Sequence, residues 1–167
     1  SLESSLYSTD KTIALQPASV RIHPTLVIQH TQLAKLYQSG NYAPLSLEDA
    51  VEICKEMVKR FQAHHIPVIR IGLQPTESME QHIIAGPYHT AFRQLVDSAL
   101  MYDQLEGLCV RQELSGGDLT ILTAFQDIST VRGQQNRNIK RLQERFHYEK
   151  IRVKANSNLQ RGEIRIE

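Results

Sequence analysis

A strand–helix–strand pattern in the first half of the chain constrains the fold more than any other feature. Residues 19–28 alternate between apolar and polar side chains and end in a short apolar run, which predicts a strand. A helix follows, opened by a capping box of Ser46 and Asp49 and carrying apolar residues at helical spacing as far as residue 64. Residues 67–74 then return to a strand pattern. Two strands joined by a helix predict a βαβ unit with parallel strands.

The same patterns divide the rest of the chain into shorter elements. Apolar residues between Leu6 and Leu15 indicate a helix whose first turn is missing, because no capping residue precedes a full amphipathic pattern. A turn at 115–118 separates two expected strands. The remaining predicted elements are helices at 31–38, 92–100 and 129–146, and strands at 108–114, 119–125, 150–154 and 163–166.

The predicted fold class is α/β, with a change of character near residue 107. Residues 1–106 hold the βαβ unit and the helix after it, and residues 107–167 are expected to form a small α+β subdomain with a basic helix. Charge is also uneven: residues 1–130 carry nine Lys and Arg against fourteen Asp and Glu, and residues 131–167 carry ten against four. A basic tail on an acidic body is typical of polyanion binding, and equally of a solvated helix face.

Cysteine content and hydropathy exclude two classes of function for this chain alone. Its two cysteines, Cys54 and Cys109, are far apart in sequence, whereas a cubane iron–sulfur cluster is held by three or four thiolates. The neighbouring His64 and His65 would point in different directions on a helix, which is adverse to metal binding, and no metal site is predicted. No apolar run reaches the roughly 20 residues of a membrane span and no signal peptide is evident, so we expect a cytoplasmic protein without membrane association.

Several short segments stand out by their order and spacing. They are residues 20–28 (VRIHPTLVI), 36–37, 40–42, 44–46, 68–76 (VIRIGLQPT), 85–93 (AGPYHTAFR) and 129–139. Together they resemble the C-terminal portion of bacterial radical S-adenosylmethionine (radical SAM) proteins that are similar to the catalytic subunit of Elongator. Related proteins are often labelled oxygen-independent coproporphyrinogen III oxidase, a label that rests on a shared barrel and not on a substrate site.

The resemblance implies a barrel and cofactors that extend beyond this chain. Residues 19–28 and 67–74 would be the last two strands of a partial (βα)6 radical SAM barrel. The parent enzyme would bind S-adenosylmethionine and a 4Fe-4S cluster, but the cysteine motif for the cluster and the earlier strands are absent from this sequence. We therefore expect a catalytically incomplete fragment that binds neither cofactor fully by itself and whose partner is the N-terminal cluster-binding half.

Residues that follow the two predicted barrel strands are the expected cofactor contacts. In βα-barrels, the loops after the strands carry the ligand contacts. His23 and Thr25 follow the first strand, and the resemblance implies that Gly72, Leu73 and Gln74 frame the adenine or methionine part of S-adenosylmethionine. The same Gly-Leu-Gln-Pro turn is also what a strand exit needs sterically, so both interpretations stand.

His89 and Arg93 are the expected substrate contacts. They lie one helical turn apart just after a Gly-Pro pair, so both could project from a helix start toward the barrel mouth and bind an anion. The alternative is that His89 has a purely structural role at the start of the helix.

A basic stretch with a glycine turn is the expected RNA contact. The predicted contacts are Arg132, Gln134, Gln135, Arg137 and Lys140, followed along the same helix by Arg141 and Arg145. The turn partly resembles the glycine loop that clamps a nucleic-acid backbone in KH domains, although it has one glycine where that motif has two. An Elongator-like enzyme is expected to act on transfer RNA, and guanidinium groups suit phosphate. The alternative is that these residues only solvate a helix face.

The predicted function is that of a radical enzyme fragment whose parent generates a 5′-deoxyadenosyl radical, with transfer RNA modification as the expected role. Two alternatives are a non-catalytic RNA- or protein-binding module and an oxidoreductase similar to oxygen-independent coproporphyrinogen oxidase. Because two strands cannot close a barrel, we expect their exposed edges to pair with another copy, to be covered by the tail or to lie against crystal neighbours, and we predict a homodimer.

Overall fold

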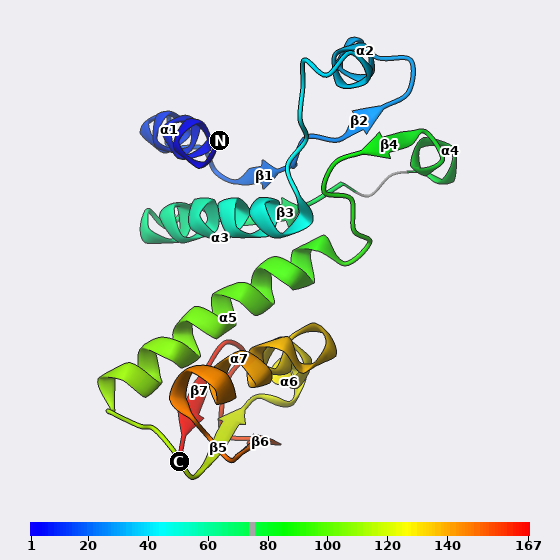
Figure 1. The fold of residues 1–167 in the computed structure, drawn as a ribbon. Helices are drawn as coiled ribbons and strands as arrows, with labels where there is room; N and C mark the ends of the chain where they lie inside the picture. The colour runs from blue at the N-terminus through cyan, green and yellow to red at the C-terminus, as the bar shows by residue number, and fades with distance from the viewer. Residues whose placement is uncertain (74–75) are drawn as a thin grey trace. The chain divides into compact units, whose positions relative to one another are not determined.

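The computed structural model describes residues 1–73 and 76–167 as a mixed α/β protein (Figure 1). Its elements in chain order are α1 (Leu2–Ala14), β1 (Val20–Ile22), β2 (Val27–Ile28), α2 (Gln32–Gln38), α3 (Leu47–Ala63), β3 (Val68–Ile71), α4 (Glu77–Glu80), β4 (Ile83–Ala85), α5 (Phe92–Arg111), β5 (Asp118–Thr123), η1 (Phe125–Asp127), α6 (Ile128–Arg132), η2 (Gln134–Asn136), α7 (Arg137–Phe146), β6 (Lys150–Ala155) and β7 (Ile164–Ile166). None of the described helices is both long and apolar enough to pass through a bilayer.

The chain divides into two compact units, and the division falls inside α5. Unit 1 comprises Ser1–Val96 and unit 2 comprises Asp97–Glu167. The sequence placed a boundary between residues 106 and 107, which also lies within this helix.

The predicted βαβ unit is present in unit 1. β1 and β3 are parallel, with Val20 opposite Val68 and Ile22 opposite Ile71. The connecting helix α3 begins at the predicted capping box, where the Ser46 hydroxyl accepts the Asp49 N–H at 3.0 Å. The buried side chains of α3 are Ala50, Cys54, Lys55, Val58 and Phe61. The prediction of two parallel strands joined by a helix is therefore confirmed.

The segment predicted as one strand, residues 19–28, is broken. β1 ends at Ile22, and β2 pairs instead with β4 in antiparallel fashion, with Val27 opposite Ala85. The break contains Pro24, which has no N–H and so cannot continue a hydrogen-bonded ladder. Within the described residues, unit 1 thus contains two separate two-stranded sheets rather than one longer sheet.

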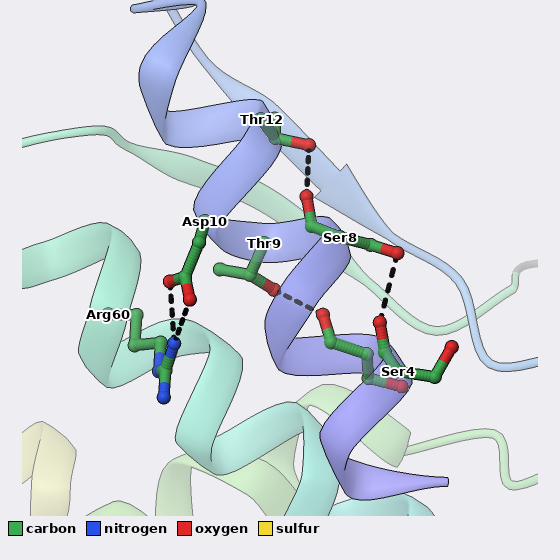
Figure 2. Close-up of polar contacts among 7 residues, drawn as sticks. Ser4, Ser8, Thr9, Asp10, Thr12 and Arg60 are labelled. Atoms are coloured by element: carbon green, nitrogen blue, oxygen red, sulfur yellow. Dashed lines mark hydrogen bonds and ion pairs between the residues drawn. The ribbon is translucent and has the colours of Figure 1, made fainter.

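The N-terminal helix α1 begins with a cap, contrary to the sequence expectation. The Ser1 hydroxyl accepts the Ser4 N–H at 3.3 Å, so a capping residue does precede the apolar pattern. Hydroxyl groups along α1 donate to carbonyl groups one turn earlier, among them Thr9 to Ser5 at 2.9 Å. Figure 2 shows the hydrogen bonds from these hydroxyl groups to the carbonyl groups, together with the ion pair between Asp10 and Arg60 of α3, which links the two helices.

Unit 2 is a three-stranded sheet packed against helices. In the strand order β6-β5-β7, β5 is parallel to β6 and antiparallel to β7. The shared core consists of Met101, Tyr102, Leu105 and Cys109 from α5, Leu119 and Ile121 from β5, Val131 from α6, Leu142 from α7, and Tyr148. Because the core joins one face of the sheet to three helices, unit 2 is a two-layer α/β arrangement.

Two predictions for unit 2 were wrong. Residues 108–114 were expected to form a strand, but α5 continues to Arg111, because Leu105 and Cys109 share its buried face at a spacing of four. The expected single helix over 129–146 is interrupted between α6 and α7, where Gly133, Gln135 and Asn136 all have positive φ. The strands predicted at 119–125, 150–154 and 163–166 correspond to β5, β6 and β7 with small shifts.

Candidate functional site

The C-terminal ends of β1 and β3 lie at the same edge and are joined by a hydrogen bond. The Gly72 N–H donates to the Ile22 carbonyl at 2.9 Å. Gly72 has φ +84°, and a Cβ placed on it would lie 2.9 Å from the Cβ of Phe92. A side chain here would therefore be both strained and blocked, so glycine allows the start of α5 to pack against the end of β3.

A second glycine brings another loop to this edge. Gly86 has φ +111°, and a Cβ on it would meet the Thr25 carbonyl oxygen at 3.0 Å and the Leu26 Cα at 3.2 Å. The backbone after β4 thus lies directly against the segment after β1. Both glycines were singled out in the sequence; in the structure Gly72 leaves room for the Phe92 side chain, and Gly86 permits a close approach of two backbone segments.

These strand ends and loops enclose a small hollow in unit 1. Its lining residues are Pro24, Leu26, Gly72, Leu73, Pro87, Tyr88, His89 and Phe92. It has space for about one water molecule, far less than a nucleoside requires. The sequence had identified Gly72, Leu73 and His89 but not Pro24, Leu26, Tyr88 or Phe92. The Gly-Pro pair at 86–87, directly after a strand, indicates a turn at the end of that strand, and this signal could have identified the lining residues.

The other predicted cofactor contacts lie beside the hollow or outside the described residues. His23 and Thr25 flank the lining residue Pro24 and are both exposed. Their side chains are therefore accessible at the edge where β1 ends. Gln74 falls outside the part of the chain that the structure describes.

His89 holds a turn through one of its two ring nitrogens. Its Nδ1 accepts the Ala91 N–H at 3.0 Å and so holds the turn that leads into α5. In the neutral ring, this places the proton on Nε2, which is then a potential donor. The next lining residue, Tyr88, donates its hydroxyl to Glu80 at 2.8 Å. This hydrogen bond is the main cause of a raised pKa of Tyr88, with desolvation and the Glu80 charge adding to it.

Arg93 lies at the other end of β3. Its Nη1 donates to the Val68 carbonyl at 3.3 Å, and Val68 begins the strand whose far end carries Gly72. The structure brings His89 to the hollow but directs Arg93 away from it, so the two predicted anion contacts do not converge. The reason is that α5 starts only at Phe92, which leaves His89 in a turn and not on the same helix face as Arg93.

The thiols of this chain do not fit an iron–sulfur cluster. Cys54 lies in unit 1 and Cys109 in unit 2, and both are buried. Burial raises the pKa of Cys54 to about 12, which keeps it a neutral thiol near pH 7, whereas a cluster is bound by thiolates. Among residues 1–73 and 76–167, no group of three or more His, Cys, Asp or Glu side chains could hold a metal ion. A 4Fe-4S cluster would need other residues.

The predicted RNA-contact turn is held from beneath by a buried amide. The Asn138 side chain donates to the Ser98 carbonyl at 2.9 Å and to the Thr130 carbonyl at 3.2 Å. A Cβ on Gly133 would lie 3.0 Å from the Asn138 side chain, so glycine allows the turn to close over it. The turn from α6 to α7 is therefore fixed to α5 within unit 2.

The basic residues of this stretch fall into two groups. Arg141 stacks on the Tyr102 ring with its guanidinium carbon 3.7 Å from the ring centre, and Arg145 pairs with Glu106 at 3.2 Å. Both bind to α5 and have a structural role. The predicted RNA contacts Arg132, Gln134, Gln135, Arg137 and Lys140 are all exposed, and their side chains have no recorded ion pair or hydrogen bond within the described residues.

Comparison with known proteins gives one family match. The family described as Radical_SAM C-terminal domain matches residues 17–102. This range covers β1, β3, the hollow and the first half of α5, and it leaves the sheet of unit 2 outside. No curated protein and no solved structure gives a significant match.

Proposed function

Since the chain belongs to the Radical_SAM C-terminal domain family, we propose that it completes the catalytic cup of a radical SAM enzyme that modifies transfer RNA. The parent would generate a 5′-deoxyadenosyl radical, and the likeness to the Elongator subunit supports RNA as its substrate. The observation that carries this proposal is the parallel pair β1 and β3, whose C-terminal ends meet at the hollow. Ligands of βα-barrels bind at that end of the strands.

This chain would contribute one edge of the cofactor site and not the whole site. The family implies S-adenosylmethionine and a 4Fe-4S cluster in the parent enzyme. The cluster has no suitable ligands here, and the hollow is too small to enclose a nucleoside. His23, Thr25, Gly72 and Leu73 would therefore border a cofactor that is held mainly by residues outside this chain.

Residues of both units would contact the substrate. At the hollow, His89 would donate a hydrogen bond from Nε2 to the substrate, and Arg93 is kept as a second predicted substrate contact. In unit 2, the exposed residues Arg132, Arg137 and Lys140 would bind phosphate groups of transfer RNA.

The experiment is to reconstitute the cluster in the full-length parent and measure 5′-deoxyadenosine after adding S-adenosylmethionine, a reductant and transfer RNA. We expect its formation to depend on all three. In Thr25→Ala and His23→Ala, the KM for S-adenosylmethionine should rise roughly tenfold, the effect of losing one hydrogen bond of about 1.4 kcal/mol. The control Gln62→Ala changes an exposed residue of α3 and should match the wild type. Absence of 5′-deoxyadenosine under every condition would overturn the proposal.

A non-catalytic RNA-binding module is the second candidate. It is favoured by the position of the exposed cations Arg132, Arg137 and Lys140, which all lie outside the family match. A protein of this kind would bind transfer RNA with the same affinity whether or not the parent can form 5′-deoxyadenosine. Binding without any 5′-deoxyadenosine formation would therefore select this candidate.

The homodimer stays a prediction. The β1–β3 pair has unpaired outer edges within the described residues, and Ile69 of β3 is 56% exposed. Light scattering of the chain over a range of concentrations measures the association. A mass that stays monomeric at the highest concentration would contradict it.

A further inference from the structure

The sheet of unit 2 has one covered face and one open face. Leu119, Ile121 and Thr123 of β5 are buried, and the first two belong to the core shared with the helices. The alternate residues Thr120 and Leu122 are only partly buried. Since successive residues of a strand point to opposite faces, Thr120 and Leu122 lie on the side that no helix of unit 2 covers. Parallel strand pairs such as β5 and β6 are usually buried on both faces, so an open face is a candidate for a partner.

Cations dominate this open face. On β6, Lys150, Arg152 and Lys154 alternate with the half-buried Ile151 and Val153. The register places Lys154 opposite Leu122 on one side of β5 and Arg165 opposite Leu122 on the other, so all three side chains point to the same face.

Three carboxylates lie near these four cations. Asp118 binds Arg152 at 2.8 Å, Glu167 pairs through its backbone with Thr120, and Glu163, two residues before Arg165, accepts the Gln160 N–H at 2.9 Å. Lys150, Lys154 and Arg165 are exposed, and no ion pair is recorded for them in the described part of the chain. The face therefore keeps an excess of positive charge.

An exposed aromatic residue stands at the end of the central strand. Phe125 lies two residues after the end of β5 and is 79% exposed, and hydrogen bonds hold the residues around it. The Gly162 N–H donates to the buried Asp127 carboxylate at 2.7 Å, and the Asn156 N–H donates to the Thr123 carbonyl at 2.8 Å. These bonds join the segment after β5 to the loop between β6 and β7, so the ring of Phe125 is presented to solvent on a hydrogen-bonded support.

We propose that this open face, defined by Lys150, Arg152, Lys154, Arg165 and the adjoining Phe125, binds a single-stranded segment of RNA. The cations contact phosphate groups, and the Phe125 ring stacks on an unpaired base. The inference deepens the proposed function and rests on its RNA substrate. A membrane surface fits less well, because membrane-bound faces need several exposed apolar anchors, and this face presents one aromatic ring.

The first test measures binding of the full chain to a fluorescein-labelled oligouridylate and to unmodified transfer RNA at several salt concentrations. The test variant is Lys150→Ser, Lys154→Ser and Arg165→Ser combined. Each phosphate contact on a single strand contributes about 0.7 to the slope of log K against log salt, so we expect the slope to fall by about two and the affinity to fall more than tenfold near 0.1 M salt. The control variant removes three exposed cations elsewhere, Lys11, Lys35 and Arg111, and should bind like the wild type.

The outcomes separate this inference from the proposed function. If the sheet variant binds as the wild type does while Arg132→Ser, Arg137→Ser and Lys140→Ser combined loses affinity, the open face is not the RNA site but the proposed RNA role survives. If the wild type binds neither RNA, this inference and the RNA part of the proposal both fail, whereas 5′-deoxyadenosine formation still tests the radical chemistry. Equal binding to phosphatidylserine vesicles with the same salt dependence would also overturn it.

A second variant tests base stacking without disturbing charge. Phe125→Ala should keep the thermal stability of the wild type, because the ring is largely exposed. We expect roughly tenfold weaker binding to the single strand and unchanged binding to a fully paired RNA duplex, since paired bases cannot stack on the ring. Equal losses for both probes, or no loss for either, would remove Phe125 from the site.

Discussion

Units 1 and 2 each contain a pair of parallel strands joined through helices, but they differ in how many further strands and helices pack against that pair. In unit 2, β5 is paired with β6 over six residues and with β7 on its other side, and it shares a core with three helices. In unit 1, β1 and β3 form a short two-stranded sheet, and Ile69 of β3 remains 56% exposed. The central strand of unit 2 is therefore paired on both sides, whereas each strand of the β1–β3 pair in unit 1 has one unpaired edge within the described residues.

The largest expected effect separates the two strand pairs directly. Ile121→Ala removes a fully buried side chain from β5 and should lower the free energy of unfolding of unit 2 by about 2–5 kcal/mol. Ile69→Ala, at an exposed position of β3, should cost less than about 0.5 kcal/mol in this chain. Hydrogen exchange followed by mass spectrometry would report each unit separately.

The same Ile69 variant sharpens the comparison when it is placed in the full-length parent. If other strands cover β3 in the parent, the side chain of Ile69 is buried there. Ile69→Ala should then lower the free energy of unfolding by much more than it does in this chain. An equally small loss of stability in both proteins would show that no other strand covers β3, and would argue against the proposed barrel.

A smaller effect is expected at the hollow of unit 1. Gly72→Ala and Gly40→Ala both place a side chain at a positive φ of +84° and +75°, which costs about 1–2 kcal/mol. At Gly40 a Cβ meets nothing within 4 Å, whereas at Gly72 it would lie 2.9 Å from Phe92. Urea unfolding should therefore show Gly72→Ala to be less stable than Gly40→Ala by roughly another 1–3 kcal/mol, the cost of overpacking. Equal stability of the two variants would mean that α5 does not pack on β3 as described.

The Cys54 thiol gives a pH-dependent difference. Its pKa rises from about 9 in the unfolded chain to about 12 in the fold through desolvation. Below pH 9 the thiol is protonated in both the folded and the unfolded chain, so burying it does not oppose folding. Between pH 9 and 12 only the unfolded chain loses this proton, which favours the unfolded chain, so the stability of the fold decreases as the pH rises. The melting temperature of the wild type should thus decrease more between pH 8 and 10.5 than that of Cys54→Ala. Parallel curves for the two proteins would contradict this burial.

The smallest expected effect concerns the link between α1 and α3. Arg60 and Asp10 form an ion pair whose side chains are 41% and 56% exposed (Figure 2). Exposed ion pairs contribute about 0–1 kcal/mol. Arg60→Ala should therefore lower stability by less than about 1 kcal/mol, and the difference from wild type should shrink in high salt. A larger, salt-independent loss would indicate that the aliphatic part of Arg60 packs between the helices.

Local signals in the sequence were reliable where they act within one element. The capping box at Ser46 and the switch to strand residues at 68 identified α3 and β3, because caps and periodicity are local properties. The break of 19–28 could not be read in this way. β2 turns to pair with β4, which lies more than fifty residues further along, and only tertiary pairing determines that choice.

The candidate sites show the same limit. Gly72 and His89, which the sequence singled out, both line the hollow at the strand ends, whereas the direction of Arg93 depends on where α5 begins. Likewise, nothing in the sequence distinguishes Arg141 and Arg145, which bind Tyr102 and Glu106, from the exposed Arg132 and Arg137. Charge can be counted from a sequence, but its partners come from packing.

The alternation along β6 has a consequence for how this region tolerates change. Ile151 and Val153 pack against the core, while Lys150, Arg152 and Lys154 point to the open face. Core packing and ligand binding therefore depend on different positions of the strand. In random mutagenesis of this strand, substitutions at Ile151 and Val153 should reduce solubility, and substitutions at Lys150, Arg152 and Lys154 should reduce ligand binding. The exterior of the sheet could then be redesigned for a new ligand while its interior is left as it is.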